Sequence, residues 1–258
     1  MRPLIRLVVV IAIAALVTVG GWTHALAQDD WMRVDIVQVL PDKLDDYIEL
    51  QLEEVNPALR RAGVPYRSAW RTAEFGNTYE RLFVTPIANL ADYDTGGPLA
   101  RGMDPAGLAQ LRDRVRRFTM SRQSYAVRYH PELSVEVDNP SGLFLARVVT
   151  IQIGPGRGAE WEAFLRENLP MFRNADVVFG VYERVFGPGP TSWQIVENYS
   201  SYAELGSTTI VDRAFGEQSG EVAFGLSGVV TSVERTVLRY DAELSFSAPP
   251  SSTQQQDN

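Results

Sequence analysis

The alternation of apolar and polar residues predicts two similar series of strands and helices. Residues 34–39 (VDIVQV) and 147–153 (RVVTIQI) are short runs rich in β-branched residues, as expected of strands. In the first run Val37 and Val39 form a wholly apolar face, which we expect to lie under helices. Beyond it, from residue 42 to residue 63, apolar residues recur at helical spacing: Leu44, Tyr47, Ile48, Leu52, Val55 and Leu59.

This first predicted helix carries local signals at its ends and in its interior. Asp42 stands where an N-cap is expected, and Gly63 stands where the helix should end. Pro57 falls inside the helix, as Pro170 does in the corresponding part of the second series. Because proline has no amide hydrogen, we expect a kink or a helix restart there, with Asn56 as the capping residue.

Each series continues with a strand pair, a second helix and a closing strand. The strand pairs are residues 66–73 with 79–86 and residues 178–186 with 192–199, each joined by a hairpin-like turn. The second helix is clearest at Leu108, Leu111, Val115 and Phe118. The closing strands are VRYHPELS (127–134) and LRYDAELS (238–245). This order, β-α-β-β-α-β, is that of a ferredoxin-like unit.

The two series are copies of one another. Gln38 matches Gln152 at an offset of 114 residues, whereas Ser121 matches Ser232 at an offset of 111. We therefore expect a tandem repeat in which the second copy has small net deletions in loops. The first repeat spans residues 32–134 and the second spans residues 143–246, with residues 135–142 (VEVDNPSG) as a turn-rich linker.

A ferredoxin-like unit has a sheet with helices on one face, and its other face must be buried against something. Two such units in one chain can bury each other, sheet to sheet. The sequence thus predicts an α+β protein in which two fused ferredoxin-like units form one pseudo-dimeric α/β barrel with antiparallel sheets. In this pattern most of the chain resembles the dimeric α/β-barrel superfamily. That superfamily includes the antibiotic-biosynthesis monooxygenases, the EthD-like and NIPSNAP-like proteins, and the chlorite-dismutase-like haem proteins. No motif selects one of these families.

Both ends of the chain differ from the repeats in composition. Residues 1–27 have the pattern of a signal peptide: Arg2 and Arg6, an apolar run over residues 7–19, and the small-x-small sequence Ala-Leu-Ala at residues 25–27. We expect an exported protein, periplasmic or extracellular, without a stable membrane anchor after cleavage, although a retained anchor is the alternative. The Pro, Ser and Gln residues of 247–258 predict a disordered tail.

Charge and cysteine content exclude some classes of function. The formal net charge is −8, which argues against nucleic acid as a partner because phosphate binding needs a basic face. The chain has no cysteine, so an exported protein of this kind is held together by its core and not by disulfides. The oligomeric state does not follow from the sequence.

Strand alternation indicates which side chains face the interior of the expected barrel. A largely apolar space with a few polar groups is typical of small-molecule sites. The candidate ligand-pocket residues are Gln38, Gln152, Trp70, Tyr182, Arg128, Arg239 and Trp193. The alternative interpretation is that these aromatic residues are packing and that the two glutamines bond each other across the barrel.

Candidate catalytic chemistry is sparse. His130 is the one histidine outside the predicted signal peptide, and the superfamily resemblance raises haem ligation by it. We expect instead a solvated loop histidine, because it precedes Pro131 at a strand end. A single histidine also argues against a metal site. Glu183 aligns with Arg71, so these two residues either pair or point outward. The arginines of residues 111–118 (LRDRVRRF) predict a solvated helix face and not an anion site. No catalytic residue can be named.

Three functions therefore stay open. The first is binding of a small, partly apolar molecule in the cavity between the two sheets. The second is a cofactor-poor oxygenase or isomerase, as the superfamily resemblance implies. The third is a structural or interaction module with a filled barrel.

Overall fold

The computed structural model describes residues 31–135 and 144–247. The expected signal peptide, most of the linker and nearly all of the expected tail lie outside the described residues. The strands are β1 (Trp31–Val39), β2 (Tyr66–Thr72), β3 (Glu80–Pro86), β4 (Thr119–Tyr129), β5 (Leu145–Ile153), β6 (Gly180–Phe186), β7 (Ser192–Tyr199), β8 (Val230–Tyr240) and β9 (Phe246–Ser247). Within the described residues, no helix is long and apolar enough to cross a membrane.

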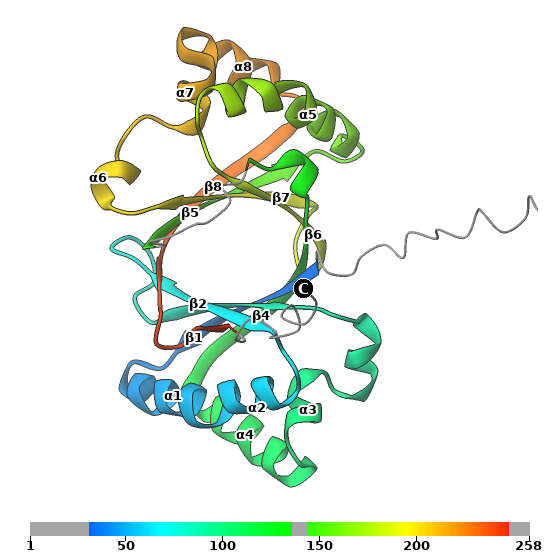
Figure 1. Ribbon diagram of the computed structural model, residues 1–258, viewed down its shortest axis with the longest axis vertical. Coiled ribbons are helices and arrows are strands. Elements are labelled where there is room, and N and C mark those ends of the chain that lie inside the picture. Colours follow the sequence, from blue (N-terminus) through cyan, green and yellow to red (C-terminus); the bar gives the residue numbers. More distant parts are fainter. Residues whose placement is uncertain (1–30, 136–143, 248–258) are drawn as a thin grey trace, which may run out of the picture.

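Eight of these strands form a closed antiparallel barrel in an α+β protein (Figure 1). The strand order is β3-β1-β4-β6-β7-β5-β8-β2, and β2 pairs with β3 to close the barrel. The strands β1 to β4 make one half and β5 to β8 make the other. The halves meet at two seams, where β4 pairs with β6 and β2 pairs with β8.

The helices lie outside the barrel, at opposite ends of the molecule (Figure 1). Those of the first half are α1 (Leu44–Leu50), the π-helical segment η3 (Gln51–Val55), α2 (Asn56–Arg61), α3 (Pro98–Gly102) and α4 (Pro105–Phe118). Those of the second half are α5 (Gly158–Asn174), α6 (Tyr202–Leu205), α7 (Ile210–Phe215) and α8 (Ser219–Gly225). Short 3-10 turns are η2 (Pro41–Lys43), η4 (Leu90–Thr95), η5 (Pro131–Leu133) and η6 (Gly216–Gln218).

Alternate strand residues divide into an outer core and a barrel interior. Val37 and Val39 pack under the first-half helices, and Ile151 and Ile153 pack under the second-half helices, as the pattern predicted. The opposite faces fill the interior with two clusters, one centred on Val34, Tyr125 and Val127 and the other on Trp70, Ala146 and Leu238.

The two seams have matching aromatic contacts. Tyr129 on β4 lies opposite Tyr182 on β6, with ring centroids 5.1 Å apart. Trp70 on β2 lies opposite Tyr240 on β8, also with centroids 5.1 Å apart. Each half thus contributes one member of each pair, and the interior is shared between the halves.

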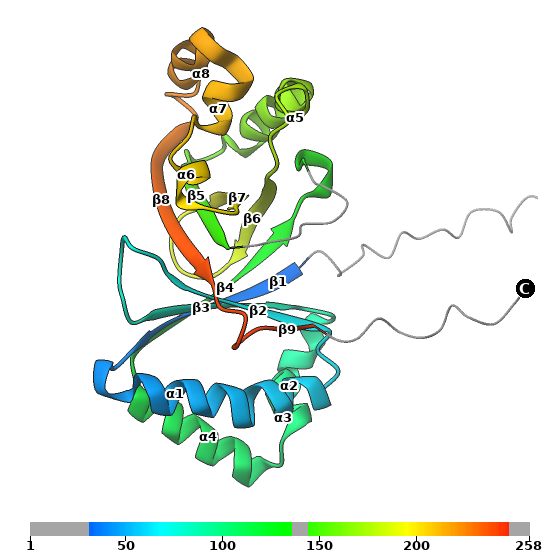
Figure 2. The same cartoon turned by 60° about the vertical axis from the view of Figure 1, so that its left-hand side comes forward.

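The repeated segment Glu-Leu-Ser crosses from each half into the other. Leu133, which follows β4, is buried in the core of the second half, and Leu244, which follows β8, is buried in the core of the first half. The Ser134 hydroxyl accepts from the Val181 amide at 2.9 Å, and the Ser245 hydroxyl accepts from the Ala69 amide at 2.8 Å. The strand β9 then pairs with β2 (Figure 2). This exchange explains why the chain carries nearly the same eight residues twice.

Three local expectations are corrected by the structure. Asp42 caps no helix, because it lies in η2 and α1 begins at Leu44 without a side-chain cap. Asn56 is helical and caps nothing, and the helix continues through it without a restart. The closing strands begin and end earlier than expected, since β4 ends at Tyr129 and β8 ends at Tyr240.

Candidate functional site

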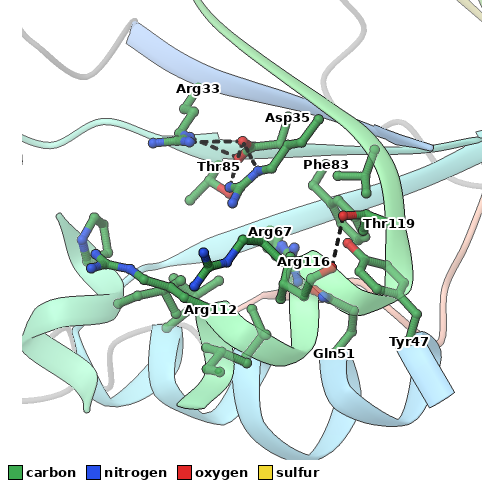
Figure 3. A pocket seen from close by; sticks show the side chains of 18 of the residues that line it. Arg33, Asp35, Tyr47, Gln51, Arg67, Phe83, Thr85, Arg112, Arg116 and Thr119 are labelled. Atoms are coloured by element: carbon green, nitrogen blue, oxygen red, sulfur yellow. Dashed lines mark hydrogen bonds and ion pairs between the residues drawn. The ribbon is translucent and has the colours of Figure 1, made fainter. Parts of the chain in front are cut away.

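A cavity of about 480 Å³ lies between the sheet of the first half and its own helices (Figure 3). It does not lie between the two sheets, where the sequence had suggested a chamber. Its polar lining comprises Arg33, Asp35, Tyr47, Gln51, Arg67, Thr85, Tyr93, Arg112, Arg116, Thr119 and Arg122. The apolar lining comprises Val37, Val55, Leu59, Phe83, Pro98, Leu99, Leu111 and Val115, with Gly96 at one side.

Strand alternation brings the sheet residues of the cavity to one face. Arg33, Asp35 and Val37 are alternate residues of β1 and therefore point toward the helices. Phe83 and Thr85 do the same on β3, where they lie opposite Asp35 and Arg33 in the strand register. The same periodicity that predicted an apolar face at Val37 and Val39 thus continues into a polar stretch at the start of β1.

The helix that faces these strands contains a π-helical turn at Gln51–Val55, and both of these residues line the cavity. Between Tyr47 and Pro57 the first half has one residue more than the second half, because Tyr47 precedes Trp161 by 114 positions but Pro57 precedes Pro170 by 113. The π-helical turn lies within this stretch and accommodates the extra residue. The second-half helix α5 is α-helical throughout. One deletion that was expected in a loop is therefore an insertion within a helix. Such π-turns are frequent at functional sites.

Arg67 lines the cavity and is buried, with 6% of the residue exposed. Its Nη1 donates to Oδ1 of Asn56 at 2.7 Å, and its guanidinium carbon stands 3.8 Å from the centre of the Phe83 ring. Asn56 is itself held by a hydrogen bond from its Nδ2 to the carbonyl of Leu244. Burial lowers the pKa of Arg67 to about 10. Its Nε has no hydrogen-bond partner among the described residues.

Asp35 is shared by two arginines. Arg33 donates to both carboxylate oxygens at 2.9 Å, and Nη2 of Arg122 donates to Oδ1 at 2.9 Å. Burial by itself raises the pKa of Asp35, but the hydrogen bonds from Arg33 and the charge of Arg122 outweigh it and lower the pKa to about 2. The carboxylate is therefore ionised at any ordinary pH and neutralises one of its two partners.

The cavity is cationic although the protein is acidic. Five arginines and one aspartate line it. Arg112 and Arg116 reach it from α4, and both side chains are exposed at its edge. The sequence interpretation of this helix as a solvated face is right about exposure. It misses that these two arginines face the same space as Arg67 and Asp35 (Figure 3).

Most of the corresponding positions in the second half carry apolar side chains, although Arg147 and Glu197 stand at the positions of Arg33 and Thr85. Strand register places Phe179 at the position of Arg67, Val149 at that of Asp35 and Val233 at that of Arg122. On the helix, Leu165 takes the place of Gln51. Trp161, Leu165, Phe172, Phe179 and Trp193 belong there to one continuous buried cluster. The two halves share a framework, and polar residues open a cavity in one of them.

No family model matches the chain, and no match was found among curated proteins. Solved structures do match. An anthrone oxidase-like protein has a TM-score of 0.58 and 11% identity, covering 85% of this chain and 94% of its own. A mutant chlorite dismutase from Candidatus Nitrospira defluvii has a TM-score of 0.54 and 10% identity, covering 85% and 94%. A proposed monooxygenase from Lactobacillus acidophilus has a TM-score of 0.50 and 11% identity, covering 84% and 95%.

This chain has the dimeric α/β-barrel fold. The similarity spans both halves, so the single chain supplies what this architecture needs for a complete barrel. At this level of identity the likeness establishes the fold, and the chemistry has to be argued from the residues of this barrel.

The dimeric α/β barrel separates the seven candidate pocket residues. Trp70 and Tyr182 face its interior, where they pack against other aromatic rings. Trp193 lies on the other face of the sheet, buried under the second-half helices. The arginines also face outward: Arg128 contacts Glu183, and Arg239 contacts Glu74 and Tyr202.

The two glutamines do not meet across the barrel in the way the sequence allowed. Gln38 donates to Oδ1 of Asn77 at 3.0 Å near an exposed hairpin, whereas Gln152 is half-buried on β5, on the face that carries Val148. Polar contacts in the interior join other residues: Gln194 donates to the hydroxyl of Tyr125 at 3.1 Å, and the indole of Trp70 donates to the hydroxyl of Ser68 at 3.2 Å. Binding of a ligand in the interior stays a prediction.

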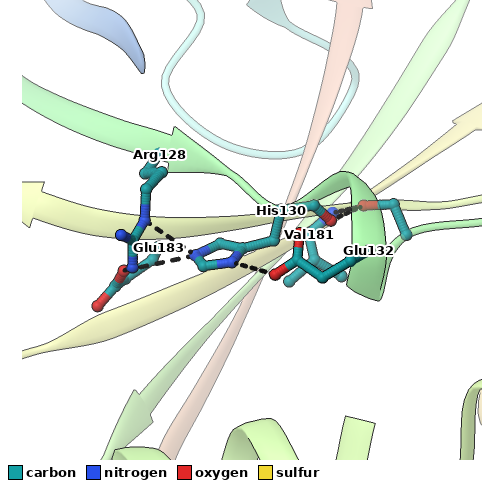
Figure 4. A network of polar contacts seen from close by, with 6 residues as sticks. Arg128, His130, Glu132, Val181 and Glu183 are labelled. Carbon is teal, nitrogen blue, oxygen red and sulfur yellow. Dashed lines mark hydrogen bonds and ion pairs between the residues drawn. The ribbon is translucent and has the colours of Figure 1, made fainter. Parts of the chain in front are cut away.

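His130 is buried, with 6% of the residue exposed, so its expected position as a solvated loop residue is wrong. Its Nδ1 lies 3.0 Å from Glu132 and its Nε2 lies 3.4 Å from Glu183 (Figure 4). Its ring stands 4.9 Å from that of Trp193. The 3-10 turn η5 buries it by folding residues 131–133 back against β6. Glu183 therefore pairs with His130 and Arg128, and not with Arg71.

The surroundings of His130 do not fit haem. Both ring nitrogens face carboxylates, and an indole covers the ring. The residue also does not line the cavity described above. Among the described residues there is likewise no group of three or more histidine, cysteine, aspartate or glutamate side chains that could hold a metal ion.

Sequence reasoning missed Arg67, Asn56, Gln51 and Asp35. One signal was available for all four, since Asn56 has Leu169 as its counterpart at the offset of 113 that relates Pro57 to Pro170. Gln51 stands on the apolar stripe of its helix, and its counterpart in the second repeat is Leu165. Arg67 and Asp35 have Phe179 and Val149 as counterparts. A search for positions that are polar in one repeat and apolar in the other would have found this cavity.

Proposed function

We propose that the protein binds a small, partly apolar molecule in the cavity between the first-half sheet and the helices α1, α2 and α4. The observation that carries this proposal is the contrast between the halves. A fold whose second half closes the same space with Leu165 and Phe179 does not need Gln51 and Arg67 for stability. The cavity volume of about 480 Å³ also falls in the range of small-molecule sites, roughly 300 to 1,000 Å³.

A blocking substitution tests this proposal. Val115 is half-buried on α4 and lines the cavity, so Val115→Phe should fill it. We expect a fatty acid, a phenol or a quinone at saturation to raise the melting temperature of the wild-type protein by several degrees, since a ligand that binds only the folded state stabilises it. The same ligand should leave the melting temperature of Val115→Phe unchanged in thermal-shift measurements.

The matched control is Val222→Phe. Val222 packs against the core of the second half, away from the cavity, so this variant should keep the ligand response. A ligand that stabilises Val115→Phe as much as the wild-type protein counts against the cavity as its site. If no member of the three ligand classes stabilises the wild-type protein, the proposed function loses its support.

A second candidate is oxidation of the bound molecule in the same cavity. What favours it is that solved structures of this fold include a proposed monooxygenase and an anthrone oxidase-like protein. The measurement that separates an enzyme from a binding protein is oxygen consumption with an anthrone or a hydroquinone. Val115→Phe serves again as the blocked control.

We also propose that the two halves are fused copies of one ferredoxin-like unit. The support is that equivalent strands pair in the same register, with Asp35 opposite Phe83 and Val149 opposite Ile195. Export to the periplasm or the cell exterior stays a proposal on the sequence of residues 1–27 alone.

A further inference from the structure

We propose that the ligand of this cavity is an amphipathic anion whose carboxylate binds the guanidinium of Arg67. This inference rests on the proposed function, because it names the chemical class of the molecule that the cavity takes. It departs from the sequence interpretation, which saw neither Arg67 nor an anion site.

Arg67 is a buried cation without an anionic partner. Among the described residues its one hydrogen bond is the donation from Nη1 to the neutral amide of Asn56. Nη1 is the nitrogen on the Cδ side of the guanidinium, so Nε and Nη2 share the opposite edge. That edge matches the two oxygens of a carboxylate, which arginine binds through two parallel hydrogen bonds. The Nε of this edge is buried and unpartnered.

Three other arginines that face the helices have a carboxylate, whereas Arg81, which is as buried as Arg67, donates to two backbone carbonyls. Arg147, at the position of Arg33 in the second half, pairs with the buried Glu197, and Arg33 and Arg122 share Asp35. A buried charge without a counter-ion is strongly unfavourable, and proteins pair it or place it at a ligand site. Because Arg67 faces the cavity, a ligand carboxylate is the counter-ion that the fold leaves room for.

Gln51 adds a second unpartnered polar group. The residue is 2% exposed, it lies in the π-helical turn, and its Oε1 has no hydrogen-bond partner among the described residues. A primary amide can present either its oxygen or its NH₂ group to the cavity, so it suits a polar head group that both donates and accepts. Two buried side chains from different elements, each with one unpartnered polar atom, thus line the same cavity.

The remaining lining fits the rest of such a molecule. Leu59, Leu111 and Val115 offer an apolar surface for a hydrocarbon or aromatic body. The exposed arginines Arg112 and Arg116 place positive charge at the edge of the cavity on a protein of net charge −8. Local positive charge attracts anions to the entrance and raises the rate of association.

Matched acid and alcohol pairs test the inference. Dissociation constants are measured by titration calorimetry for decanoate against decanol and for naphthoate against naphthylmethanol. We call the acid of the two that binds more tightly the better acid. We expect the wild-type protein to bind it at least about tenfold more tightly than the corresponding alcohol. Arg67→Met keeps an unbranched side chain of the length of the arginine stem and removes the guanidinium charge, so the preference for the acid should vanish.

The matched control is Arg81→Met. Arg81 is also buried on the same sheet, but it donates to backbone carbonyls and does not line the cavity. This variant should keep the acid preference. If Arg67→Met does not fold, Arg67→Lys retains a charge without the two-nitrogen edge and should show a reduced preference.

The outcomes are distinct for the two proposals. Equal affinity of the wild-type protein for acid and alcohol overturns the anionic head group and leaves the proposed function standing. An acid preference that persists in Arg67→Met or is unchanged in Arg67→Lys overturns the assignment to Arg67. Failure of all four probes to bind overturns both the proposed function and this inference.

Discussion

At the scale of single residues, the imidazole of His130 shows how a polar network is placed at a seam of the barrel. It lies between Glu132 and Glu183, and Arg128 also contacts Glu183. Burial alone lowers the pKa of His130, but the hydrogen bonds to Glu183 and Glu132 outweigh it and raise the pKa above its ordinary value of 6.5. The hydrogen bonds with His130 lower the pKa values of both carboxyl groups against the effect of burial, and Arg128 lowers that of Glu183 further.

The network therefore gives a pH dependence whose sign can be stated. A raised pKa in the folded state means that protonated His130 stabilises the fold below pH 6.5, and that this contribution is lost as the pH rises through the folded pKa. We expect the free energy of unfolding of the wild-type protein to exceed that of His130→Gln by about 1.5 to 3 kcal/mol near pH 6, as for hydrogen bonds to charged groups. The difference should shrink toward pH 9.

Urea unfolding of both proteins across this pH range checks the prediction. Glu132→Gln is the companion variant, because it removes one carboxylate and keeps the imidazole. It should lower the pKa of His130, which NMR of the ring protons measures directly. A stability difference between wild type and His130→Gln that grows with pH would contradict the assignment.

At the scale of elements, the π-helical turn at Gln51–Val55 is a feature of the first half that the second half lacks. One extra residue rotates the helix that follows it relative to the sheet. After this turn, Asn56 contacts Arg67 and Leu59 lines the cavity. In α5, without the extra residue, Leu165, Leu169 and Phe172 all pack into one cluster. Pro57 is compatible with the turn because it offers no amide hydrogen to the helical pattern.

Deleting Glu53 tests this role. Glu53 is exposed within the π-turn, and its removal should restore a regular α-helix like α5. We expect a folded protein that has lost its response to ligand in the thermal-shift experiment. Deleting the exposed Glu167 from α5 is the control, because α5 has no π-helical turn and therefore no extra residue to lose. It should displace Leu169 and Phe172 and lower the free energy of unfolding by about 3 to 5 kcal/mol.

Much of this element order could be predicted from the sequence. The two-residue and helical periodicities of residues 34–63 predicted β1 and the helix after it, and the repeat predicted the second half. The start of β4 was missed because residues 119–124 are polar except for Met120 and show no alternation of apolar and polar side chains. The π-turn was missed because Leu52 and Val55 continue a helical pattern across it. The site was missed because Asp35, Gln51 and Arg67 lie on three separate elements and line one cavity only in the folded chain.

At the scale of the whole molecule, each half completes its core with a residue of the other. Leu133 is fully buried in the second half, and Leu244, with 1% exposed, is buried in the first. The carbonyl of Leu244 also accepts from Asn56, which holds Arg67. The cavity of the first half therefore depends on a residue near the far end of the chain.

Substitution of these two leucines should separate stability from binding. Leu244→Ala and Leu133→Ala should each lower the free energy of unfolding by about 2 to 5 kcal/mol, the usual cost of such a cavity. Leu244→Ala keeps the main-chain carbonyl that accepts from Asn56 but removes the side chain that fixes this segment in the core. It should therefore also weaken ligand binding, whereas Leu133→Ala should not. Urea unfolding followed by fluorescence and circular dichroism, with titration of the better acid, measures both effects. Equal ligand affinities in the two variants would argue against this coupling.

The reciprocal exchange also constrains how the protein is made. A ribosome synthesises the first half long before residues 241–247, which carry Leu244 and Phe246 into its core. Until those residues are made, the core of the first half lacks two of its side chains beneath α1 and α2. Leu133, by contrast, is made before the second half into whose core it packs. The half that carries the cavity is the first to be translated and the last to be finished.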